Sequence, residues 1–369
     1  MKIGFDAKRA FHNYAGLGNY SRLLIQSLSE LYSENQYFLF TPKYKPHTLH
    51  NFADKDNCKI FTQIGIASCF PSAFWRSFLI AKEINTQNID IFHGLSGELP
   101  VSTLKMPKVV TVHDLIFMRY PEFYAIIDRK MYEKKFKHAC KNADKIIAIS
   151  KQTADDCIHF LNADPKKIEI VYQSCDPIFF SSQIDNEIIN KYDIPKKFIL
   201  NIGTIETRKN LLNLVKALPC LDDEISLVAI GRRTSYINDI EHYIKENHLS
   251  HRVKLLHDVP FRDFPAFYAA ASAFVYPSVF EGFGIPILEA LSVGTPIATS
   301  NLSSMPEVGG DAALYFDPYN IEDIASKINL LLNDKKTVTE LNGHRSKQLE
   351  KFSIQDITKK VNEIYISCI

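Results

Sequence analysis

The chain has 369 residues and carries 43 Lys and Arg residues against 42 Asp and Glu residues. This balance of charge argues against a general nucleic-acid-binding protein, and the length predicts two domains, each with its own core. The seven cysteines are scattered without a CxxC pair, which favours free thiols in a reducing compartment over a disulfide framework or a zinc site.

The first residues, MKIGFDAKRAF, contain no apolar stretch of the kind found in signal peptides. No apolar run in the chain approaches the roughly 20 residues of a membrane-spanning helix. We therefore expect a cytoplasmic protein, and contact with the inner face of a membrane stays open.

Short apolar runs alternate with helical patterns through the first half of the chain. Buried strands are expected at residues 2–6, 89–94, 108–114 and 144–150. A helix is expected at about residues 122–141, and Ser150 is a candidate N-cap for the helix that follows the fourth strand. This alternation is typical of a parallel sheet covered by helices.

The alternation restarts after a polar segment, residues 176–197, that contains Pro177 and Pro195 and has the composition of a linker. Further strands are expected at residues 197–204, 224–232, 252–256, 273–278 and 296–300. The pattern predicts an α/β protein with two Rossmann-like, doubly wound domains, residues 1–180 and 195–350, facing across a cleft, with ligands at the carboxyl ends of the strands. Residues 351–369 are expected to form a helix that packs back on the N-terminal domain.

Two loops have features of phosphate-binding sites. Gly16 and Gly18 in YAGLGNYSRLL lie just before a helical pattern, where glycine would let backbone N–H groups approach an anion. No third glycine is in register, so the dinucleotide fingerprint is incomplete, and an ordinary turn is the alternative.

The second loop, GTIETRKNLLNLVKAL, places Arg208 and Lys209 at the first turn of an expected helix. The helix dipole disfavours cations at that end, so a bound anion would explain them. A solvated basic pair is the alternative. Arg232 and Arg233, on a neighbouring loop, are interpreted as exposed surface residues, and a contribution to the positive potential of the site is the alternative.

The stretch EGFGIPILEAL, from Glu281 to Leu291, carries two glutamates in an otherwise apolar run. Pro286 suits the first position of a helix, which Gly294 would end, so both glutamates would lie near a positive helix end that keeps them ionised. A carboxylate accepts two hydrogen bonds from a vicinal diol. Phosphate-binding cations together with diol-binding acids indicate a nucleotide sugar; a turn cap and a surface ion pair are the alternative.

These residues resemble the retaining glycosyltransferases of the GT-B fold, specifically family 4, over nearly the whole chain. The family signature is a glutamate, seven residues and a second glutamate within E-G-F-G-x-P-x-x-E, which the run from Glu281 to Glu289 matches in full. The resemblance implies that Glu281 binds the donor sugar, that Glu289 binds the ribose, and that Arg208 and Lys209 carry the diphosphate. Many members have arginine where this chain has Thr204.

The resemblance also implies that residues 1–180 bind the acceptor and that residues 195–350 bind the nucleotide sugar, with a donor-binding role for other loop residues. The further donor-binding residues it indicates are Gly16, Gly18, Gly203, Thr204, Phe283, Gly284 and Ile285. His113, in VTVHDL with Asp114 beside it, matches a strand-end histidine that approaches the transferred sugar, and a structural role is its alternative. His93 is a weaker candidate of the same kind.

The function implied is transfer of a hexosyl group, best taken as mannosyl, from a GDP- or UDP-sugar to a saccharide or lipid-linked saccharide acceptor in surface polysaccharide synthesis. The family retains anomeric configuration, and no DxD motif stands where a metal-dependent transferase would need it, so neither a metal nor a cofactor is expected. A sugar-nucleotide epimerase or phosphorylase of the same fold, an inactive nucleotide-sugar-binding protein and an NAD-dependent oxidoreductase are the alternatives.

A separate hypothesis concerns the membrane. The helix expected at about residues 122–141 combines basic residues with apolar ones, so two interpretations stay open: a helix that rests on anionic lipid, and a solvated helix face. The basic residues are Arg129, Lys130, Lys134, Lys135 and Lys137, and the apolar ones are Phe123, Tyr124, Ile126, Ile127 and Tyr132.

Overall fold

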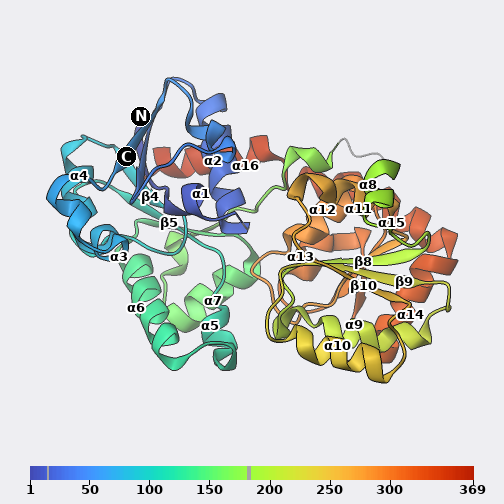
Figure 1. Ribbon diagram of the computed structural model, residues 1–369. Helices are drawn as coiled ribbons and strands as arrows, with labels where there is room; N and C mark the ends of the chain where they lie inside the picture. Colours follow the sequence, from blue (N-terminus) through green and yellow to red (C-terminus); the bar gives the residue numbers. More distant parts are fainter. Residues whose placement is uncertain (15, 181–183) are drawn as a thin grey trace. The chain divides into compact units, whose positions relative to one another are not determined.

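The structure is a computed structural model that describes residues 1–14, 16–180 and 184–369. The chain divides into two compact units (Figure 1). Unit 1 comprises Met1–Ser174 and Phe352–Ile369, and unit 2 comprises Cys175–Lys351. Part of the segment interpreted as a linker, residues 181–183, lies outside the described residues. No described helix is both long and apolar enough to cross a membrane.

Unit 1 contains a parallel sheet of seven strands in the order β3-β2-β1-β4-β5-β6-β7. The strands are β1 (Lys2–Asp6), β2 (Gln36–Thr41), β3 (Cys58–Thr62), β4 (Ile91–Gly94), β5 (Lys108–Val112), β6 (Lys145–Ala148) and β7 (Ile168–Ile170). The central strands are almost wholly buried, as expected for a parallel sheet covered on both faces. The first, fourth, fifth and sixth strands were expected from the sequence, and the other three were not singled out.

The helices of unit 1 come from both ends of the chain. They are α1 (Lys8–His12), α2 (Gly16–Leu31), α3 (Ser72–Phe74), α4 (Ile80–Thr86), α5 (Ile116–Arg119), α6 (Ile126–Asn142), α7 (Lys151–Leu161) and α16 (Ile354–Ile366). The Ser150 hydroxyl accepts the Thr153 N–H at 3.0 Å and caps α7, as predicted. The C-terminal helix α16 packs in the same core as α2, and Figure 1 shows the two side by side.

Unit 2 contains a parallel sheet of six strands in the order β10-β9-β8-β11-β12-β13. The strands are β8 (Phe198–Ile202), β9 (Ser226–Ile230), β10 (Val253–Leu256), β11 (Ala273–Tyr276), β12 (Ile297–Ser300) and β13 (Leu314–Phe316). The helices are α8 (Asn186–Lys191), α9 (Leu211–Ala217), α10 (Ile237–Glu246), α11 (Phe264–Ala270), α12 (Ile285–Val293), α13 (Met305–Gly309), α14 (Ile321–Asn333) and α15 (Lys335–Glu350).

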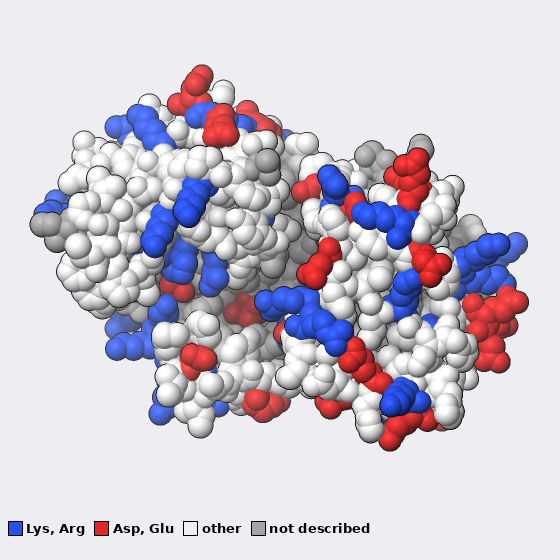
Figure 2. Space-filling view, in the orientation of Figure 1, with Lys and Arg blue, Asp and Glu red and all other residues white. Residues whose placement is uncertain are grey.

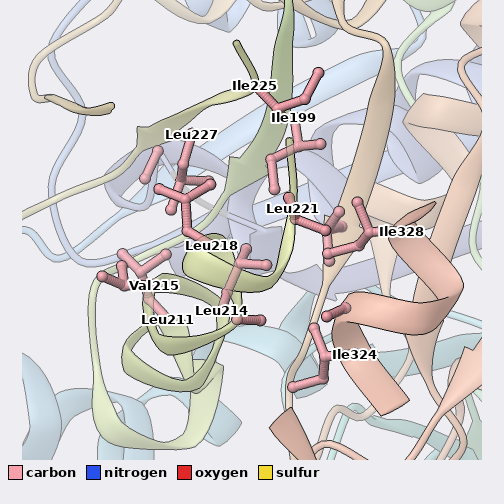
Figure 3. Packing of buried hydrophobic residues seen from close by; sticks show 14 of the residues in the cluster. Ile199, Leu211, Leu214, Val215, Leu218, Leu221, Ile225, Leu227, Ile324 and Ile328 are labelled. Atoms are coloured by element: carbon pink, nitrogen blue, oxygen red, sulfur yellow. The ribbon is translucent and has the colours of Figure 1, made fainter. Parts of the chain in front are cut away.

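The core on one face of this second sheet fixes α9, the helix that follows Arg208 and Lys209. Leu211, Leu214 and Leu218, at helical spacing along and just after α9, pack with Ile324 and Ile328 of α14 (Figure 3). Burying a leucine or isoleucine side chain stabilises the fold by about 1.5–3 kcal/mol. Helix α9 is therefore held firmly against the sheet, together with the turn that leads into it.

Candidate active site

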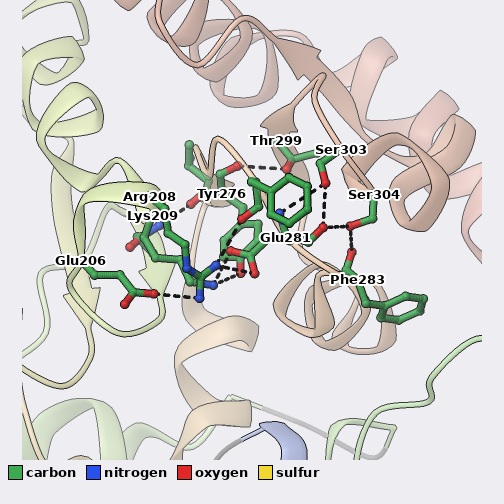
Figure 4. A network of polar contacts seen from close by, with 12 residues as sticks. Glu206, Arg208, Lys209, Tyr276, Glu281, Phe283, Thr299, Ser303 and Ser304 are labelled. Carbon is green, nitrogen blue, oxygen red and sulfur yellow. Dashed lines mark hydrogen bonds and ion pairs between the residues drawn. The ribbon is translucent and has the colours of Figure 1, made fainter. Parts of the chain in front are cut away.

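The structure brings Glu281, Arg208 and Lys209 together in unit 2 (Figure 4). The two cations lie in a 3₁₀ turn, Thr207–Lys209, that follows β8, and Glu281 lies in the loop after β11. Strands β8 and β11 are neighbours, so the loops at their carboxyl ends meet. Lys209 Nζ lies 2.5 Å from Glu281 Oε1, and Arg208 Nη1 lies 2.9 Å from Glu281 Oε2.

Burial and charge act against each other in this cluster. Burial alone would raise the pKa of Glu281, but the charges of Arg208 and Lys209 and their hydrogen bonds lower it to about 2. Burial lowers the pKa of Lys209, and the charge of Glu281 opposes that shift. The carboxylate is therefore ionised at neutral pH, and it favours the charged form of the lysine.

Further contacts fix the direction of the two cations. Lys209 Nζ donates to the Tyr276 hydroxyl at 2.5 Å and lies 4.9 Å from the centre of that ring. Arg208 Nη2 lies 2.7 Å from Glu206 Oε1, and its Nη1 donates to the Phe280 carbonyl at 3.2 Å. Because each cation has several partners, it is held before any ligand arrives, which is the arrangement that stabilises developing charge most effectively.

Two serines hold the glycine-rich loop that carries Glu281. Ser303 and Ser304 donate to the Glu281 carbonyl at 2.7 and 2.9 Å, and Ser304 also lies 2.6 Å from the Phe283 carbonyl (Figure 4). No motif in the sequence pointed to these serines or to Tyr276. The sequence feature that could have indicated the two serines is their place in a serine-rich loop directly after β12, a strand of the same sheet.

Helix α12 begins directly after this loop. Gly284 is its N-cap, with a positive φ of 113° that favours glycine, and Gly294 ends it in the left-handed conformation, as predicted. Pro286 is the second residue of the helix and not the first. Ile285 opens the helix, so its positive end lies beside the loop of Glu281.

Glu289 differs from Glu281 in its charge state. It is the fifth residue of α12, is buried, and accepts a hydrogen bond from the Tyr268 hydroxyl at 2.8 Å. Burial, together with the charge of Asp176, raises its pKa to about 7. The expectation that the helix end keeps both glutamates ionised was therefore wrong for Glu289, because loss of solvent outweighs the helix dipole.

The two glycines of the N-terminal loop lie inside the first turn of α2 and not before it. A Cβ atom built on Gly18 would lie 1.6 Å from the Asn13 carbonyl oxygen, whereas one built on Gly16 would have no atom within 4 Å. The requirement for glycine at position 18 is thus explained by the close approach of Asn13.

His113 lies just beyond the end of β5 in unit 1 and is buried. Its Nε2 lies 2.9 Å from the Leu95 carbonyl, so that nitrogen carries the proton, and its Nδ1 accepts from Gln173 Nε2 at 2.9 Å. Burial lowers its pKa to about 4. Both ring nitrogens are engaged by protein groups and the ring is neutral, so His113 is not suited to transferring protons.

His93 has a structural role. Its two ring nitrogens lie 2.6 Å from the Tyr365 hydroxyl and 2.8 Å from the Thr111 hydroxyl, and the side chain is fully buried. Burial lowers its pKa to about 3. The two arginines interpreted as exposed, Arg232 and Arg233, are both exposed, and Arg233 pairs with Glu241 at 2.8 Å.

Comparison with known families covers both units. The sequence profile of glycosyl transferases group 1 matches residues 183–348, and that of glycosyltransferase family 4 matches residues 14–178. Together the two matches take in nearly the whole chain. The chain belongs to the family 4 glycosyltransferases of the GT-B fold.

Named relatives and solved structures agree with this family. O-antigen chain mannosyltransferase B of Escherichia coli is 33% identical over 251 residues, which are 66% of this chain and 65% of that protein. O-antigen chain mannosyltransferase RfbU of Salmonella typhimurium is 28% identical over 57% of each chain. The match thus spans between about half and two thirds of these relatives.

Among solved structures, Anabaena Alr3699/HepE in complex with UDP and glucose has a TM-score of 0.76 at 16% identity, over 100% of this chain and 99% of that one. The lipopolysaccharide biosynthesis glycosyltransferase WaaG has a TM-score of 0.72 at 14% identity, over 99% of each chain. At these identities the likeness concerns the fold. In this family 4 glycosyltransferase, the acidic, basic and glycine-rich motifs of unit 2 converge at one edge of a single sheet.

Proposed function

We propose that this chain transfers a hexosyl group from a nucleoside diphosphate sugar to a saccharide or lipid-linked saccharide acceptor in surface polysaccharide synthesis. The observation that carries the proposal is the cation pair, Arg208 and Lys209, held by Glu281 beside the start of α12. A departing nucleoside diphosphate gains negative charge on its terminal phosphate, and two fixed cations next to a helix N-terminus would stabilise it.

The reaction follows from this charge arrangement. The two cations take the part that a bound metal takes in other transferases, so we propose a metal-independent reaction without a cofactor. Retention of configuration then proceeds by front-face attack of the acceptor hydroxyl, with the backbone of Phe283, Gly284 and Ile285 near the diphosphate. Glu289 binds the ribose hydroxyls, and His113 positions the sugar without exchanging a proton, since its ring nitrogens are occupied.

Mannose is the sugar we propose, with GDP-mannose as donor, because relatives of this chain are named as O-antigen mannosyltransferases. Release of nucleoside diphosphate from a panel of GDP-, UDP- and ADP-sugars, with and without a mannoside acceptor, tests this choice. Faster release of nucleoside diphosphate from a UDP-sugar than from GDP-mannose would mean that the donor is the UDP-sugar. Interconversion of sugar nucleotides without transfer would favour an epimerase, and nucleotide binding without turnover would favour an inactive binding protein.

The cation pair itself is tested by Arg208→Ala and Lys209→Ala. Each change is expected to lower the transfer rate by about 10²–10³-fold, the cost of removing one fixed charge-stabilising group. Arg233→Ala is the matched control, since Arg233 is an arginine of the same sheet edge that pairs with Glu241 outside the cluster. Near-normal transfer by both cluster variants, with unchanged melting temperatures, would refute the site.

We also infer that the start of α6 contacts anionic lipid. Ile126 and Ile127 are 65% and 82% exposed, and Met131 is 44% exposed one turn further on. Exposed lysines continue the same stretch at positions 130, 134, 137 and 141. Figure 2 shows basic side chains gathered where α6 lies in Figure 1. Apolar side chains would enter the interface while the lysines face lipid phosphates.

Co-sedimentation with vesicles tests the membrane contact. The protein is expected to bind vesicles that contain phosphatidylglycerol and to bind pure phosphatidylcholine vesicles weakly. Ile127→Ser combined with Lys134→Gln should release it, whereas Lys336→Gln, a change of an exposed lysine on α15, should not. Vesicle binding that depends neither on lipid charge nor on the double substitution in α6 would contradict the proposed membrane contact.

A further inference from the structure

A cavity of about 180 Å³ lies within unit 1 and shares His113 with the proposed donor site. It is lined by residues that follow three neighbouring strands: Arg9 after β1, Ser96 and Glu98 after β4, and His113 and Asp114 after β5. Ligands of parallel sheets bind at this edge. This volume is about that of six molecules of liquid water, which is enough for one small polar ring.

One wall of the cavity is aromatic. Phe117, Tyr124, Tyr132 and Phe136 line it, and the centre of the Phe117 ring lies 5.7 Å from that of Tyr132 and 5.2 Å from that of Phe136. Phe117 is buried, while the other three rings are partly exposed toward the cavity. A rigid aromatic wall with a few polar groups opposite it is the usual composition of a small-molecule site, and it suits the apolar face of a sugar ring.

One polar group of the lining, Glu98, is fixed by an ion-pair network. Arg76 pairs with Asp6 at 2.5 Å, and both Arg76 Nη1 and Lys135 Nζ lie 3.4 Å from Glu98 Oε2. The second oxygen of Glu98 has no hydrogen bond or ion pair among the described residues. A carboxylate held in this way can accept hydrogen bonds from sugar hydroxyls.

Arg9 is the group that this network leaves uncompensated. Within the described part of the chain its guanidinium has no carboxylate within ion-pair distance, and its buried Nε has no hydrogen-bond partner. Its neighbour Lys8 also has no ion pair among the described residues. The pKa of Lys8 is lowered, mainly by burial and in addition by repulsion from the charges of Arg76 and Arg9. A partly buried cation without a partner destabilises the empty site, so an anion bound there would be favoured.

We propose that this cavity binds the acceptor through a saccharide that carries an anionic group, either the carboxylate of a uronic acid or a phosphate. Arg9 pairs with the anion, the aromatic wall packs on the sugar ring, and Glu98 accepts from its hydroxyls. The inference rests on the proposed transferase function, for which it specifies the acceptor class.

Ligand-observed NMR titration of the full chain tests this assignment with three probes: methyl glucuronide, mannose 1-phosphate and the neutral methyl mannoside. Both anionic sugars, or one of them, are expected to bind at least about tenfold more tightly than the neutral one. Preference between the two anionic probes separates a uronic acid from a phosphate. Arg9→Gln should remove the advantage of the anion, and Tyr132→Leu should weaken all three probes.

Lys105→Gln is the matched control, since Lys105 is an exposed cation of unit 1 outside the cavity. Equal affinity for charged and neutral sugars, no saturable binding of either anionic sugar, or an unchanged preference in Arg9→Gln would overturn the proposal. A loss of GDP or UDP binding in Arg9→Gln would also overturn it by placing Arg9 at the donor. Failure of the unsubstituted protein to bind any nucleotide would count instead against the transferase function.

Discussion

Glu281 holds two cations with its two carboxylate oxygens, so any sugar hydroxyl that binds it must share those oxygens. The residue therefore has a function before the donor arrives: its charge opposes the burial that lowers the pKa of Lys209. At the scale of single residues, the carboxylate favours the charged form of the lysine, which the proposed diphosphate-binding role requires.

Glu281→Gln is expected to lower the pKa of Lys209 further, because the amide has no charge to offset burial. The alkaline limb of the transfer rate should then begin at a lower pH than in the unsubstituted protein. A pH–rate profile from about pH 6 to 10 measures the shift, with Glu241→Gln, an exposed glutamate paired with Arg233, as control. A profile that only scales down, with its alkaline limb unmoved, would argue against this positioning role.

Glu289 gives a prediction for stability. Its pKa in the folded chain is raised from 4.5 to about 7, so the folded state binds the proton more tightly than the unfolded state. The resulting stabilisation is full below pH 4.5 and is lost as pH rises through 7, and it amounts to about 3 kcal/mol.

In Glu289→Gln this contribution to pH dependence disappears. Urea denaturation at pH 4.5 and at pH 8 gives the change in unfolding free energy between the two pH values for each protein. We expect this change to be smaller by about 3 kcal/mol in the variant than in the parent. The same pH dependence in both proteins would mean that Glu289 stays ionised when folded. In the proposed ribose-binding role, nucleotide affinity should also fall as pH drops below about 7, because the protonated group accepts fewer hydrogen bonds.

At the scale of elements, the junction of α1 and α2 depends on one glycine. The Asn13 carbonyl occupies the space that a Cβ atom at position 18 would need, whereas position 16 is open. The two glycines look alike in the sequence, and only the path of the chain before α2 distinguishes them.

Gly18→Ala is expected to destabilise the protein by about 1–3 kcal/mol, because the α1–α2 connection must open to admit the methyl group. Gly16→Ala, the matched control two residues earlier, should be neutral or stabilising by up to about 1 kcal/mol from helix propensity. Thermal melting compares the two variants directly. Equal melting temperatures of the two variants would show that the chain around Asn13 accommodates a methyl group at position 18 without a loss of stability.

For the whole molecule, the chain returns to unit 1 after completing unit 2. Ile357, Val361 and Ile364 of α16 pack into the core that contains α2, and the Tyr365 hydroxyl lies 2.6 Å from His93 Nδ1. Burial of each large apolar side chain contributes about 1.5–3 kcal/mol, which together rivals the 5–15 kcal/mol stability of a typical domain.

Truncation after Lys351 is therefore expected to unfold or loosen unit 1 while unit 2 stays ordered. Hydrogen exchange would report the loss of protection in β1, β4 and α2, and its retention in β8 and β11. Removal of Ile369 alone, a residue that is 65% exposed, serves as the control and should leave the exchange pattern unchanged. Protection that survives loss of α16 would show that the first 174 residues form a sufficient core.

Strands that are almost wholly buried, such as β1, β8 and β11, were predicted well because a buried parallel strand has a mostly apolar pattern that does not depend on its neighbours. β3 and β7 have no buried residue and β7 has only three residues, which weakens their pattern, whereas β2 was not singled out although it is buried at all but its first position. The motif around Glu281 was predicted, but the serines that hold its loop were not, because they are brought there by the neighbouring strand β12.

The sequence by itself determined the two sheets, the family and the set of acidic and basic residues in unit 2, because local periodicity and a contiguous motif encode these features. Only the tertiary structure decided that Glu281 is ionised while Glu289 titrates near neutrality, and that both ring nitrogens of His113 are occupied. It also decided that Arg9 lines a cavity in which no carboxylate of the described residues lies within ion-pair distance of it. Charge states and unpaired groups depend on burial and on partners distant in the sequence, which no local pattern specifies.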